Sequence, residues 1–401
     1  MTDTTEKPAQ AVASKETRGT NQTGMRAQNE RLVLTLIRRH GALAKAEISR
    51  LTGLSAQTVS VIMRSLEDEG LLLKGEPQRG KVGQPSVPMR LNPEGALFLG
   101  LKVGRRSAEM IVTDFLGAII ARRKRIYAYP DFEEVRAFSL TSVQELTRSL
   151  PPENRSRVAG MGIAIPFLLW DWARVLGVEP QKMAAWQRRD LQAELAASLD
   201  MPVYLQNDAT SACSAELVFG TGEQPANFLH VFIAFFVGGG VVLNGTLFPG
   251  PTGSAGAIGP LPVIDLSGNR RQLMDIASLA VLERRLVQTG LDSAVLWDDP
   301  ESWDVPDDLL LDWTEEAANA IAHAAHAAMG VIDFEAIKID GWIPKALRED
   351  LVQKIRHRFE QMDFTGLERP TVEPGTVGAD ARALGAASQP LLARFLIGYT
   401  A

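Results

Sequence analysis

The segment Leu43–Leu91 decides the fold of the N-terminal part of the chain and reads LAKAEISRLTGLSAQTVSVIMRSLEDEGLLLKGEPQRGKVGQPSVPMRL. A helix-sized run over Ala44–Leu51 precedes the turn Thr52-Gly53-Leu54, and a second helix is expected from Ser55 to about Glu69. The apolar residues of the second helix repeat at i, i+3, i+4 and i+7, the spacing of one buried helical face: Val59, Ile62, Met63 and Leu66. The segment therefore predicts a helix-turn-helix.

The opposite face of the second helix carries polar and basic side chains, namely Gln57, Thr58, Ser60 and Arg64. Such side chains reach base edges or phosphates when a helix lies in the major groove of DNA. Ser55 is placed to cap the helix, and the positive helix end would then face the DNA backbone. We expect all five residues to contact DNA.

The stretch after the second helix is typical of a wing. Leu71–Leu73 and Val87–Leu91 are expected to form two strands around the basic, glycine-rich tip Gln78–Pro85. A tip of this kind lies along a phosphate strand or enters a minor groove, and within it we expect contacts from Arg79, Lys81 and Gln84. The alternative is a helical hairpin that only packs, but the order of the motifs favours a winged helix-turn-helix that binds DNA.

Charge is distributed unevenly along the chain. Between Arg26 and Arg90 there are 11 Lys and Arg residues against 6 Asp and Glu residues, a net charge of +5, although the whole chain carries −6. The basic excess coincides with the predicted DNA-binding module, as phosphate neutralisation requires. The acidic remainder disfavours non-specific DNA binding elsewhere on the surface.

Composition places the chain among globular, non-membrane proteins. The chain has 401 residues, of which 45% are hydrophobic and 22% charged, and this length predicts two or three domains. We expect no membrane-spanning segment and no signal peptide. Residues 1–25 have the composition of a disordered tail. The single cysteine, Cys213, excludes a disulfide within the chain and favours a cytoplasmic setting.

The body of the chain alternates predicted strands and helices, which indicates an α/β architecture. Two strand-rich openings, near residues 97 and 228, suggest two related lobes. We therefore predict a winged helix-turn-helix domain over residues 26–92, a first α/β lobe over 93–208, and a second α/β lobe over 209–401 whose C-terminal helix returns to the first lobe.

Over residues 29–398 the chain resembles the ROK family of bacterial sugar-responsive repressors and sugar kinases. The residues that carry the resemblance are the winged helix, the strand ending at Pro166, Gln206–Ala209, Gly238–Gly245, Gly253–Gly259 and the region Ala383–Ala387. The resemblance implies a two-lobed, actin/hexokinase-like (ribonuclease H-like) body behind the N-terminal domain.

The phosphate loop of the family's kinases is altered in this chain. Those kinases open the body with a strand and a D-x-G-G-T-type loop that holds ATP phosphates, whereas Lys102 stands here in place of the acidic residue. Arg105 and Arg106 replace Gly and Thr. Arginine side chains fill the space in which backbone N–H groups would approach phosphate, and the missing carboxylate removes a Mg²⁺ anchor. The resemblance therefore predicts no kinase activity and no cofactor.

The family's zinc ligands are also absent. Ser267 and Gln272 stand where cysteines of the zinc loop would be, and Pro260 stands where the further histidine ligand would be. Structural zinc requires thiolate or imidazole ligands at fixed spacing. We expect no metal, and a loop held by ordinary packing and hydrogen bonds.

The family's sugar site is partly kept. Asn207 and Asp208 remain, but the expected glutamates are Ala257 and Met274. Each lost hydrogen bond weakens hexose binding by roughly 1–3 kcal/mol. The expected effector-binding residues are Asn207, Asp208, Gly256, Ala257, Met274 and Trp170. Two interpretations remain open: the pocket binds an effector less hydroxylated than a hexose, or it binds nothing and Asn207-Asp208 only cap a helix.

The sequence thus predicts a cytoplasmic transcriptional regulator with double-stranded operator DNA and a small-molecule effector as partners. Because most of the resembling regulators repress, we expect a repressor. Proteins with this DNA-binding geometry act as dimers, so a homodimer or homotetramer is expected. The alternatives are a ROK-type sugar kinase fused to a DNA-binding domain, and a DNA-binding protein that responds to no ligand.

Overall fold

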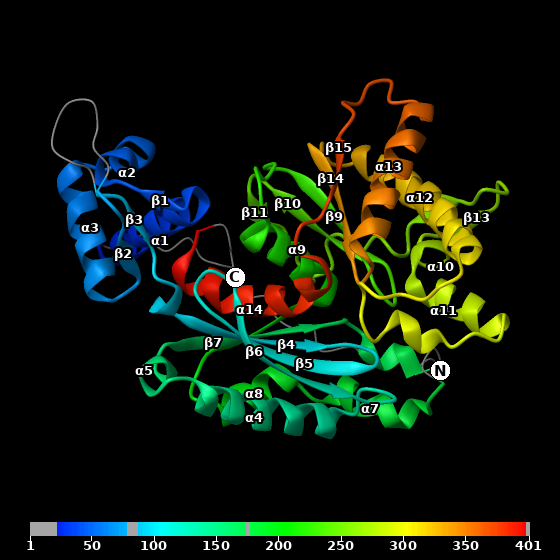
Figure 1. Ribbon diagram of the computed structural model, residues 1–401, viewed down its shortest axis with the longest axis horizontal. Coiled ribbons are helices and arrows are strands. Elements are labelled where there is room, and N and C mark those ends of the chain that lie inside the picture. Colours follow the sequence, from blue (N-terminus) through cyan, green and yellow to red (C-terminus); the bar gives the residue numbers. More distant parts are fainter. Residues whose placement is uncertain (1–21, 78–86, 174–176, 398–401) are drawn as a thin grey trace, which may run out of the picture.

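A computed structural model describes residues 22–77, 87–173 and 177–397, and Figure 1 shows a small N-terminal domain beside a two-lobed body. The N-terminal domain has three helices and a three-stranded sheet in the order β1-β3-β2. Its elements are α1 (Gln22–His40), β1 (Ala42–Leu43), α2 (Lys45–Thr52), α3 (Ala56–Asp68), β2 (Leu72–Lys74) and β3 (Met89–Leu91). The predicted winged helix-turn-helix is confirmed.

Local sequence explains the two helices of the motif. Gly53 ends α2 in the left-handed conformation (φ +71°), which favours glycine. The Ser55 hydroxyl caps α3 by accepting a hydrogen bond from the Thr58 amide at 3.1 Å. The predicted apolar stripe of α3 is buried.

Helix α1 corrects the expected N-terminal tail. The helix begins at Gln22, four residues inside the stretch for which disorder was expected. Its apolar residues Val33, Leu34 and Ile37 are buried against the rest of the protein, and this packing stabilises a helix that composition alone does not reveal.

The first lobe is built on a five-stranded sheet in the order β6-β5-β4-β7-β8. The strands are β4 (Leu97–Val103), β5 (Ser107–Thr113), β6 (Ile119–Ile126), β7 (Val158–Ile165) and β8 (Val203–Asn207). One face carries helices α4 (Phe132–Ser149), α7 (Pro180–Arg188) and α8 (Leu191–Ser198), and the C-terminal helix α14 (Ala381–Phe395) covers the other face (Figure 1). Short helical turns occupy η1 (Pro93–Gly95), α5 (Pro152–Arg155) and η2 (Leu169–Trp172).

The second lobe repeats this topology with the order β11-β10-β9-β14-β15. Its strands are β9 (Phe228–Ile233), β10 (Gly238–Leu243), β11 (Thr246–Leu247), β14 (Ala336–Gly341) and β15 (Thr371–Pro374), and a hairpin of β12 (Pro262–Ile264) and β13 (Arg270–Gln272) follows β11. Its helices are α9 (Asp208–Phe219), α10 (Met274–Ala277), α11 (Leu279–Gln288), η3 (Ser293–Leu296), α12 (Asp307–Met329), α13 (Lys345–Gln361) and η4 (Gly378–Asp380). In both sheets the first three strands are antiparallel and the last two parallel, so the predicted pair of related lobes is observed.

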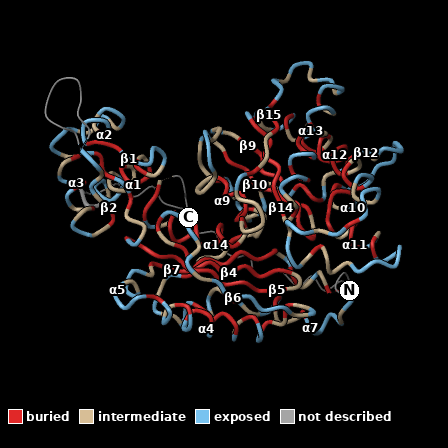
Figure 2. Tube along the Cα trace, in the orientation of Figure 1, coloured by how far each residue is buried: buried red, intermediate tan, exposed pale blue. Residues whose placement is uncertain are grey.

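Helices α9 and α14 lie against each other between the two sheets (Figure 1). The Ser214 and Ser388 hydroxyls hydrogen-bond at 2.8 Å across this contact. Figure 2 shows that α14 and strands β4 and β7 are buried along their length. The hydrophobic core of the N-terminal domain continues into this region through the aromatic group Phe98, Phe115 and Phe395.

Membrane insertion of a helix finds no support in the described residues, since none of their helices combines the length and apolarity needed to cross a bilayer.

Candidate DNA-binding surface and interlobe cleft

Helix α3 presents an uncovered stripe to solvent. Gln57, Val61 and Arg64 stand at i, i+4 and i+7 and are exposed, with 55% of Val61 accessible. Gln57 and Arg64 are among the predicted DNA contacts, whereas Val61 is not, although the helical spacing links all three. An exposed aliphatic group on such a helix suits contact with a thymine methyl group.

Two of the predicted DNA-binding hydroxyls have partners inside the domain. Thr58 Oγ1 lies 2.8 Å from the hydroxyl of the exposed Ser55, and Ser60 Oγ accepts a hydrogen bond from Lys45 Nζ at 3.3 Å. Thr58 and Ser60 are half-buried. These side chains therefore help to fix the position of α3, and each must share its hydroxyl with any DNA contact.

The predicted wing contacts, Arg79, Lys81 and Gln84, lie outside the described residues. Strands β2 and β3 that flank them pair in antiparallel register, with Leu72 opposite Leu91.

Helix α1 joins the DNA-binding domain to the body. Arg31 donates to the carbonyl oxygen of Leu392, in the last turn of α14, and to that of Leu396, the residue that follows the helix. The Thr35 hydroxyl accepts from the Ile397 amide at 3.0 Å. The end of α14 is thus fastened to α1.

Arg38 of α1 forms a second junction, with both lobes. Its guanidinium donates to the carbonyl oxygen of Phe115 at 2.8 Å, in the first lobe, and to that of Val218 at 3.2 Å, near the end of α9. The same group lies 4.9 Å from the centroid of the Phe219 ring. Burial lowers the pKa of Arg38 to about 10, and Asp114 opposes that shift. Arg38 therefore touches the DNA-binding domain, the first lobe and the second lobe at once.

Between the lobes lies a cleft that collects four of the six predicted effector-binding residues: Asn207, Asp208, Ala257 and Met274. Its other walls are largely aromatic, with Phe167, Trp172, Phe232, Phe235 and Phe236 among the lining residues. Trp172 and Phe236 meet edge to face across the cleft, with ring centroids 5.2 Å apart.

Two predicted residues do not line this cleft. Trp170 and Trp172 both pack against the core of the first lobe, but only Trp172, two residues further along the η2 turn, also lines the cleft. Gly256 lies behind the wall, where an added Cβ would come within 2.7 Å of Gly240 Cα. Its φ of +82° and this close approach explain the glycine.

Asn207 and Asp208 play different parts. Asn207, not Asp208, is the side-chain cap of α9, since its Oδ1 accepts from the amides of Ala209 and Thr210. Asp208 Oδ2 lies 3.5 Å from Arg382 Nη1, at the start of α14. Burial raises the pKa of the Asp208 carboxyl, and Arg382 only partly opposes the shift. The structural use of Asn207 agrees with one of the two interpretations. Asp208 Oδ1 also accepts from the Ala209 amide, at 3.0 Å, and Asp208 lines the cleft.

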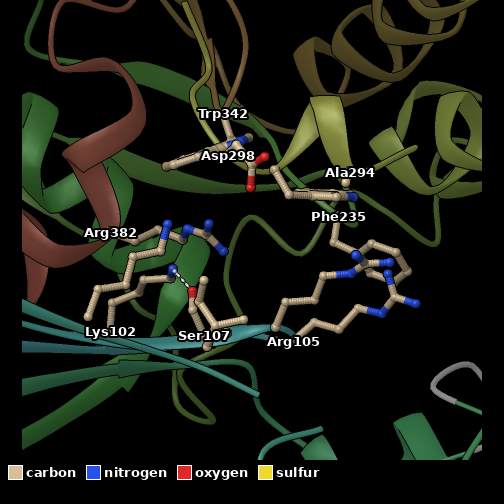
Figure 3. Close-up of a pocket in the computed structure, with 13 residues that line it drawn as sticks. Lys102, Arg105, Ser107, Phe235, Ala294, Asp298, Trp342 and Arg382 are labelled. Atoms are coloured by element: carbon tan, nitrogen blue, oxygen red, sulfur yellow. Dashed lines mark hydrogen bonds between the residues drawn. The ribbon is translucent and has the colours of Figure 1, made fainter. Parts of the chain in front are cut away.

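The loop that replaces the phosphate loop reaches across the cleft to the second lobe. Arg105 and Arg106 both pair with Glu283 of α11, at 3.0 and 2.5 Å. The Arg105 guanidinium lies 3.8 Å from the centroid of the Phe235 ring (Figure 3). We call Arg105, Arg106 and Glu283 the interlobe latch. It holds the two lobes together where a phosphate loop would need open space.

Lys102, at the position of the kinase carboxylate, is buried beneath the latch. Only 7% of it is exposed, and its Nζ donates to Ser107 Oγ at 3.0 Å (Figure 3). Burial lowers the pKa of Lys102 to about 7, and the nearby Arg382 adds to the shift.

The hairpin that replaces the zinc loop is held by hydrogen bonds. Asp265 Oδ1 accepts from the amides of Ser267 and Asn269, and these bonds lower the pKa of its carboxyl. Asn319 Nδ2 of α12 donates to the Ile264 carbonyl at 2.9 Å. These contacts fix the loop through backbone and carboxylate groups.

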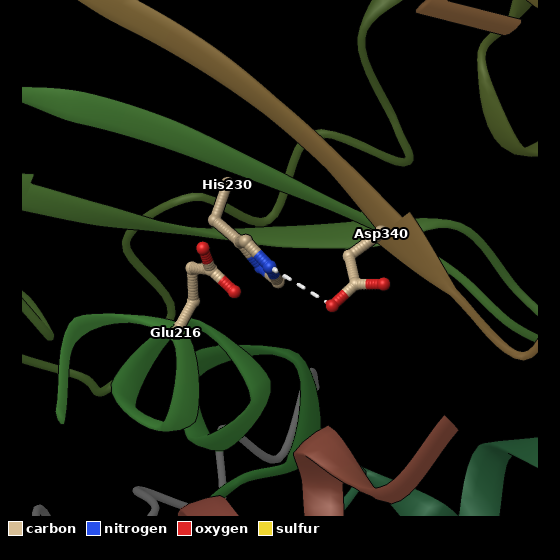
Figure 4. A group of neighbouring side chains, drawn as sticks. All are labelled: Glu216, His230 and Asp340. Atoms are coloured by element: carbon tan, nitrogen blue, oxygen red, sulfur yellow. Dashed lines mark ion pairs between the residues drawn. The ribbon is translucent and has the colours of Figure 1, made fainter. Parts of the chain in front are cut away.

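Three buried side chains of the second lobe, Glu216, His230 and Asp340, converge closely enough to be considered as metal ligands (Figure 4). Lys338 already pairs with Glu216, at 3.2 Å, and Arg348 with Asp340, at 2.5 Å. Burial lowers the pKa of His230 and so favours its neutral form. Because each carboxylate already has a cation, the group fits an internal ion-pair network that supports the second sheet.

Comparison with known proteins agrees with this architecture. The profile of the ROK family matches residues 98–391, and a profile described as winged helix-turn-helix DNA-binding matches residues 26–72. The xylose repressor of Bacillus subtilis (strain 168) is 25% identical over 248 residues, which are 62% of this chain and 63% of that protein.

Solved structures share the fold. A ROK family transcriptional regulator described as a homolog of the E. coli MLC protein superposes with a TM-score of 0.65 at 20% identity, covering 92% of this chain and 96% of that one. A ROK family glucokinase from Streptomyces griseus, in complex with glucose and AMPPNP, gives 0.55 at 19% identity, covering 73% of this chain and 98% of that one. The glucokinase match covers about three quarters of the chain, whereas the match to the regulator covers nearly all of it.

Proposed function

Because the chain belongs to the ROK family, we propose that it is a transcriptional repressor that binds operator DNA and senses a small molecule between its lobes. The observation that carries the proposal is the uncovered stripe of α3, Gln57, Val61 and Arg64, in a domain whose helix α1 is hydrogen-bonded to the C-terminal ends of α9 and α14. The domain boundaries that go with it are residues 26–92, 93–208 and 209–401.

We propose that the body does not phosphorylate sugars. Phosphoryl transfer depends on positioned Mg²⁺ and on groups that cradle the transferred phosphate. Here Lys102 occupies the position of the carboxylate, and the arginines of the loop are engaged with Glu283. A nucleotide would have to break the interlobe latch before its phosphates reached the loop backbone.

We propose that the effector is less hydroxylated than a hexose. Ala257, Pro260 and Met274 offer no side-chain hydrogen bonds, and the aromatic walls favour an apolar surface on the ligand. Asp208 is the carboxylate that remains to fix its orientation.

Two helices connect the cleft with the DNA-binding domain. Helix α9 starts at Asp208, in the cleft, and its last turn contacts Arg38 of α1. Helix α14 carries Arg382 in its first turn, beside Asp208, and its last turn contacts Arg31 of α1. Ligand binding that changes the lobe angle would shift these helix ends and thereby α1. In a homodimer or homotetramer the same shift would change the distance between two recognition helices, which must match successive half-sites.

Selection of duplexes from a random DNA library tests this function. We expect the full-length protein to enrich a motif with two-fold symmetry at near-physiological salt, and Arg64→Ala to enrich it poorly. Binding without any enriched motif would leave a non-specific DNA-binding protein and would contradict the proposal.

A further inference from the structure

A pocket distinct from the aromatic cleft opens beside the interlobe latch (Figure 3). Three cationic side chains, Lys102, Lys124 and Arg382, line it on the side of the first sheet and α14. Phe235, Trp297 and Trp342 line it from the second lobe. The pocket shares Arg105 and Arg382 with the cleft around Asp208, so the two spaces adjoin.

The pocket walls hold more hydrogen-bond donors than acceptors. Arg382 Nε, Arg105 Nε and Trp297 Nε1 are buried and have no hydrogen-bond partner among the described residues. Lys102 Nζ, with three donor hydrogens, has Ser107 Oγ as its hydrogen-bonded partner. Buried donors of this kind cost free energy unless an acceptor reaches them.

The cations of the pocket also lack counter-charges. Within the described part of the chain, Lys102 and Lys124 have no carboxylate oxygen within 4.0 Å. Glu109 lies opposite both lysines in the sheet register, but its carboxylate pairs with Arg122 at 2.9 Å. Asp208 is 3.5 Å from Arg382. The acidic lining residue Asp298 is exposed at the rim.

Aromatic rings form the other wall. Lys124 Nζ lies 5.7 Å from the centroid of the Trp342 ring, and Arg106 lies at the same distance from that of Trp297. The Trp342 indole donates to the Leu296 carbonyl at 2.8 Å, which fixes its plane. A flat apolar body could therefore pack against the indoles while its charged end faced Lys102.

We propose that this pocket binds a small organic anion: a carboxylate or phosphate group held by Lys102, Lys124 and Arg382, on a flat apolar body packed against Trp297 and Trp342. The anion supplies the acceptors that the buried donors lack, and its charge compensates the two unpaired lysines. Because the ligand touches both lobes, its binding would stabilise one lobe angle. Through that lobe angle the ligand would also alter DNA binding, and only this effect on DNA binding rests on the proposed function.

Titration without DNA tests the binding site independently of the repressor function. Benzoate and phenyl phosphate serve as probes, benzyl alcohol as the uncharged control, and the readouts are tryptophan fluorescence and the melting temperature of the full-length protein. We expect saturable binding of at least one anion below about 10 mM, with benzyl alcohol at least tenfold weaker, as loss of a charge-assisted hydrogen bond implies. Benzoate alone would identify a carboxylate site, and phenyl phosphate alone a phosphate site.

Three variants assign the binding to this pocket. Lys102→Met and Lys124→Met should each weaken anion binding about tenfold or more, while Lys345→Met, which removes an exposed lysine from α13, should leave it unchanged. Lys124 is exposed, so its removal keeps the test valid if the Lys102 variant folds poorly. Equal binding of benzyl alcohol, absence of anion binding, or binding unaffected by both pocket variants would each overturn the proposal.

Discussion

At the scale of the residue, Lys102 shows how one substitution changes the chemistry of a site. The sequence indicated only that a carboxylate had been lost, whereas the structure buries the new cation beside Arg382. Burial and this like charge lower the pKa of Lys102 from 10.5 to about 7, while Glu109 and Asp208 oppose the shift and Lys124 adds to it. Burial of the charged form of Lys102 costs free energy, which the proposed anion would offset.

The pH dependence of stability should reveal this lysine. Between about pH 7 and 10.5 the unfolded chain still holds the proton that folded Lys102 has released, so stability rises with pH across this window. From pH 7.5 to 9, wild type should gain about 1–2 kcal/mol relative to Lys102→Met. Urea unfolding at the two pH values measures the difference, and parallel profiles of the two proteins would refute the assigned burial.

The exposed stripe of α3 should determine sequence-specific binding. Arg64→Ala and Val61→Ala each remove an exposed side chain that is not part of the buried core. We expect each to weaken binding to the selected duplex by about 1–3 kcal/mol, with little effect on a scrambled duplex. Fluorescence anisotropy measures both affinities. Arg284→Ala, on an exposed position of α11, is the matched control, and a loss equal to that of Arg284→Ala would place the DNA contacts elsewhere.

At the scale of the element, the close contact of α9 with α14 is the feature on which the proposed coupling of the cleft to the DNA-binding domain depends. An added Cβ at Gly385 would overlap the carbonyl oxygen of Ser211, so the two helices approach at a distance that only glycine permits. An added Cβ at Gly240 of β10 would likewise lie 2.4 Å from the Cβ of Cys213 in α9, so a glycine is needed there too. These two glycines therefore permit the close packing of α9 against α14 and against β10.

Substitution of Gly385 should therefore separate the helices. Gly385→Ala should lower the free energy of unfolding by about 1–3 kcal/mol through overpacking. Gly330→Ala, at the end of α12, adds the same methyl group where the nearest atom, the carbonyl oxygen of Ala327, would be 3.4 Å away, and should be tolerated. Chemical denaturation compares the two, and equal stabilities would show that the helices can move apart freely.

The junction at Arg38 should hold the DNA-binding domain on the body. Arg38→Met leaves the carbonyl oxygens of Phe115, Leu116 and Val218 without this donor. We expect faster hydrogen exchange in α1 and in the end of α9, because opening of the junction costs less free energy. Arg39→Met changes the neighbouring exposed arginine and should leave exchange unchanged. Identical exchange in both variants would remove Arg38 from the coupling route.

The sequence predicted the elements better than the contacts between them. Helical periodicity located α3 and its buried stripe, and alternating apolar segments located the two lobes. It could not show that Trp172 rather than Trp170 faces the cleft, because both follow the same strand and the choice depends on the η2 turn. Nor could it pair Arg105 with Glu283, since these residues are 178 positions apart and meet only when the lobes close.

At the scale of the whole molecule, the duplicated lobes and the N-terminal domain are joined by direct contacts. The same strand order occurs in both sheets, and the cleft between them is spanned by the interlobe latch. Helices α9 and α14 connect that cleft to α1. Under the proposed function, the state of the cleft controls DNA binding from a distance.

A comparison of Glu283→Gln with wild type in their affinity for the selected duplex tests whether the cleft controls DNA binding. The substitution removes the charge that neutralises Arg105 and Arg106 and touches no part of the DNA-binding domain. Glu315→Gln is the control, since Glu315 also pairs with two cations, Lys354 and Arg358, but within the second lobe. We expect Glu283→Gln to change the affinity by about fivefold or more and Glu315→Gln to leave it unchanged. Equal affinities of all three folded proteins would contradict control of DNA binding by the cleft.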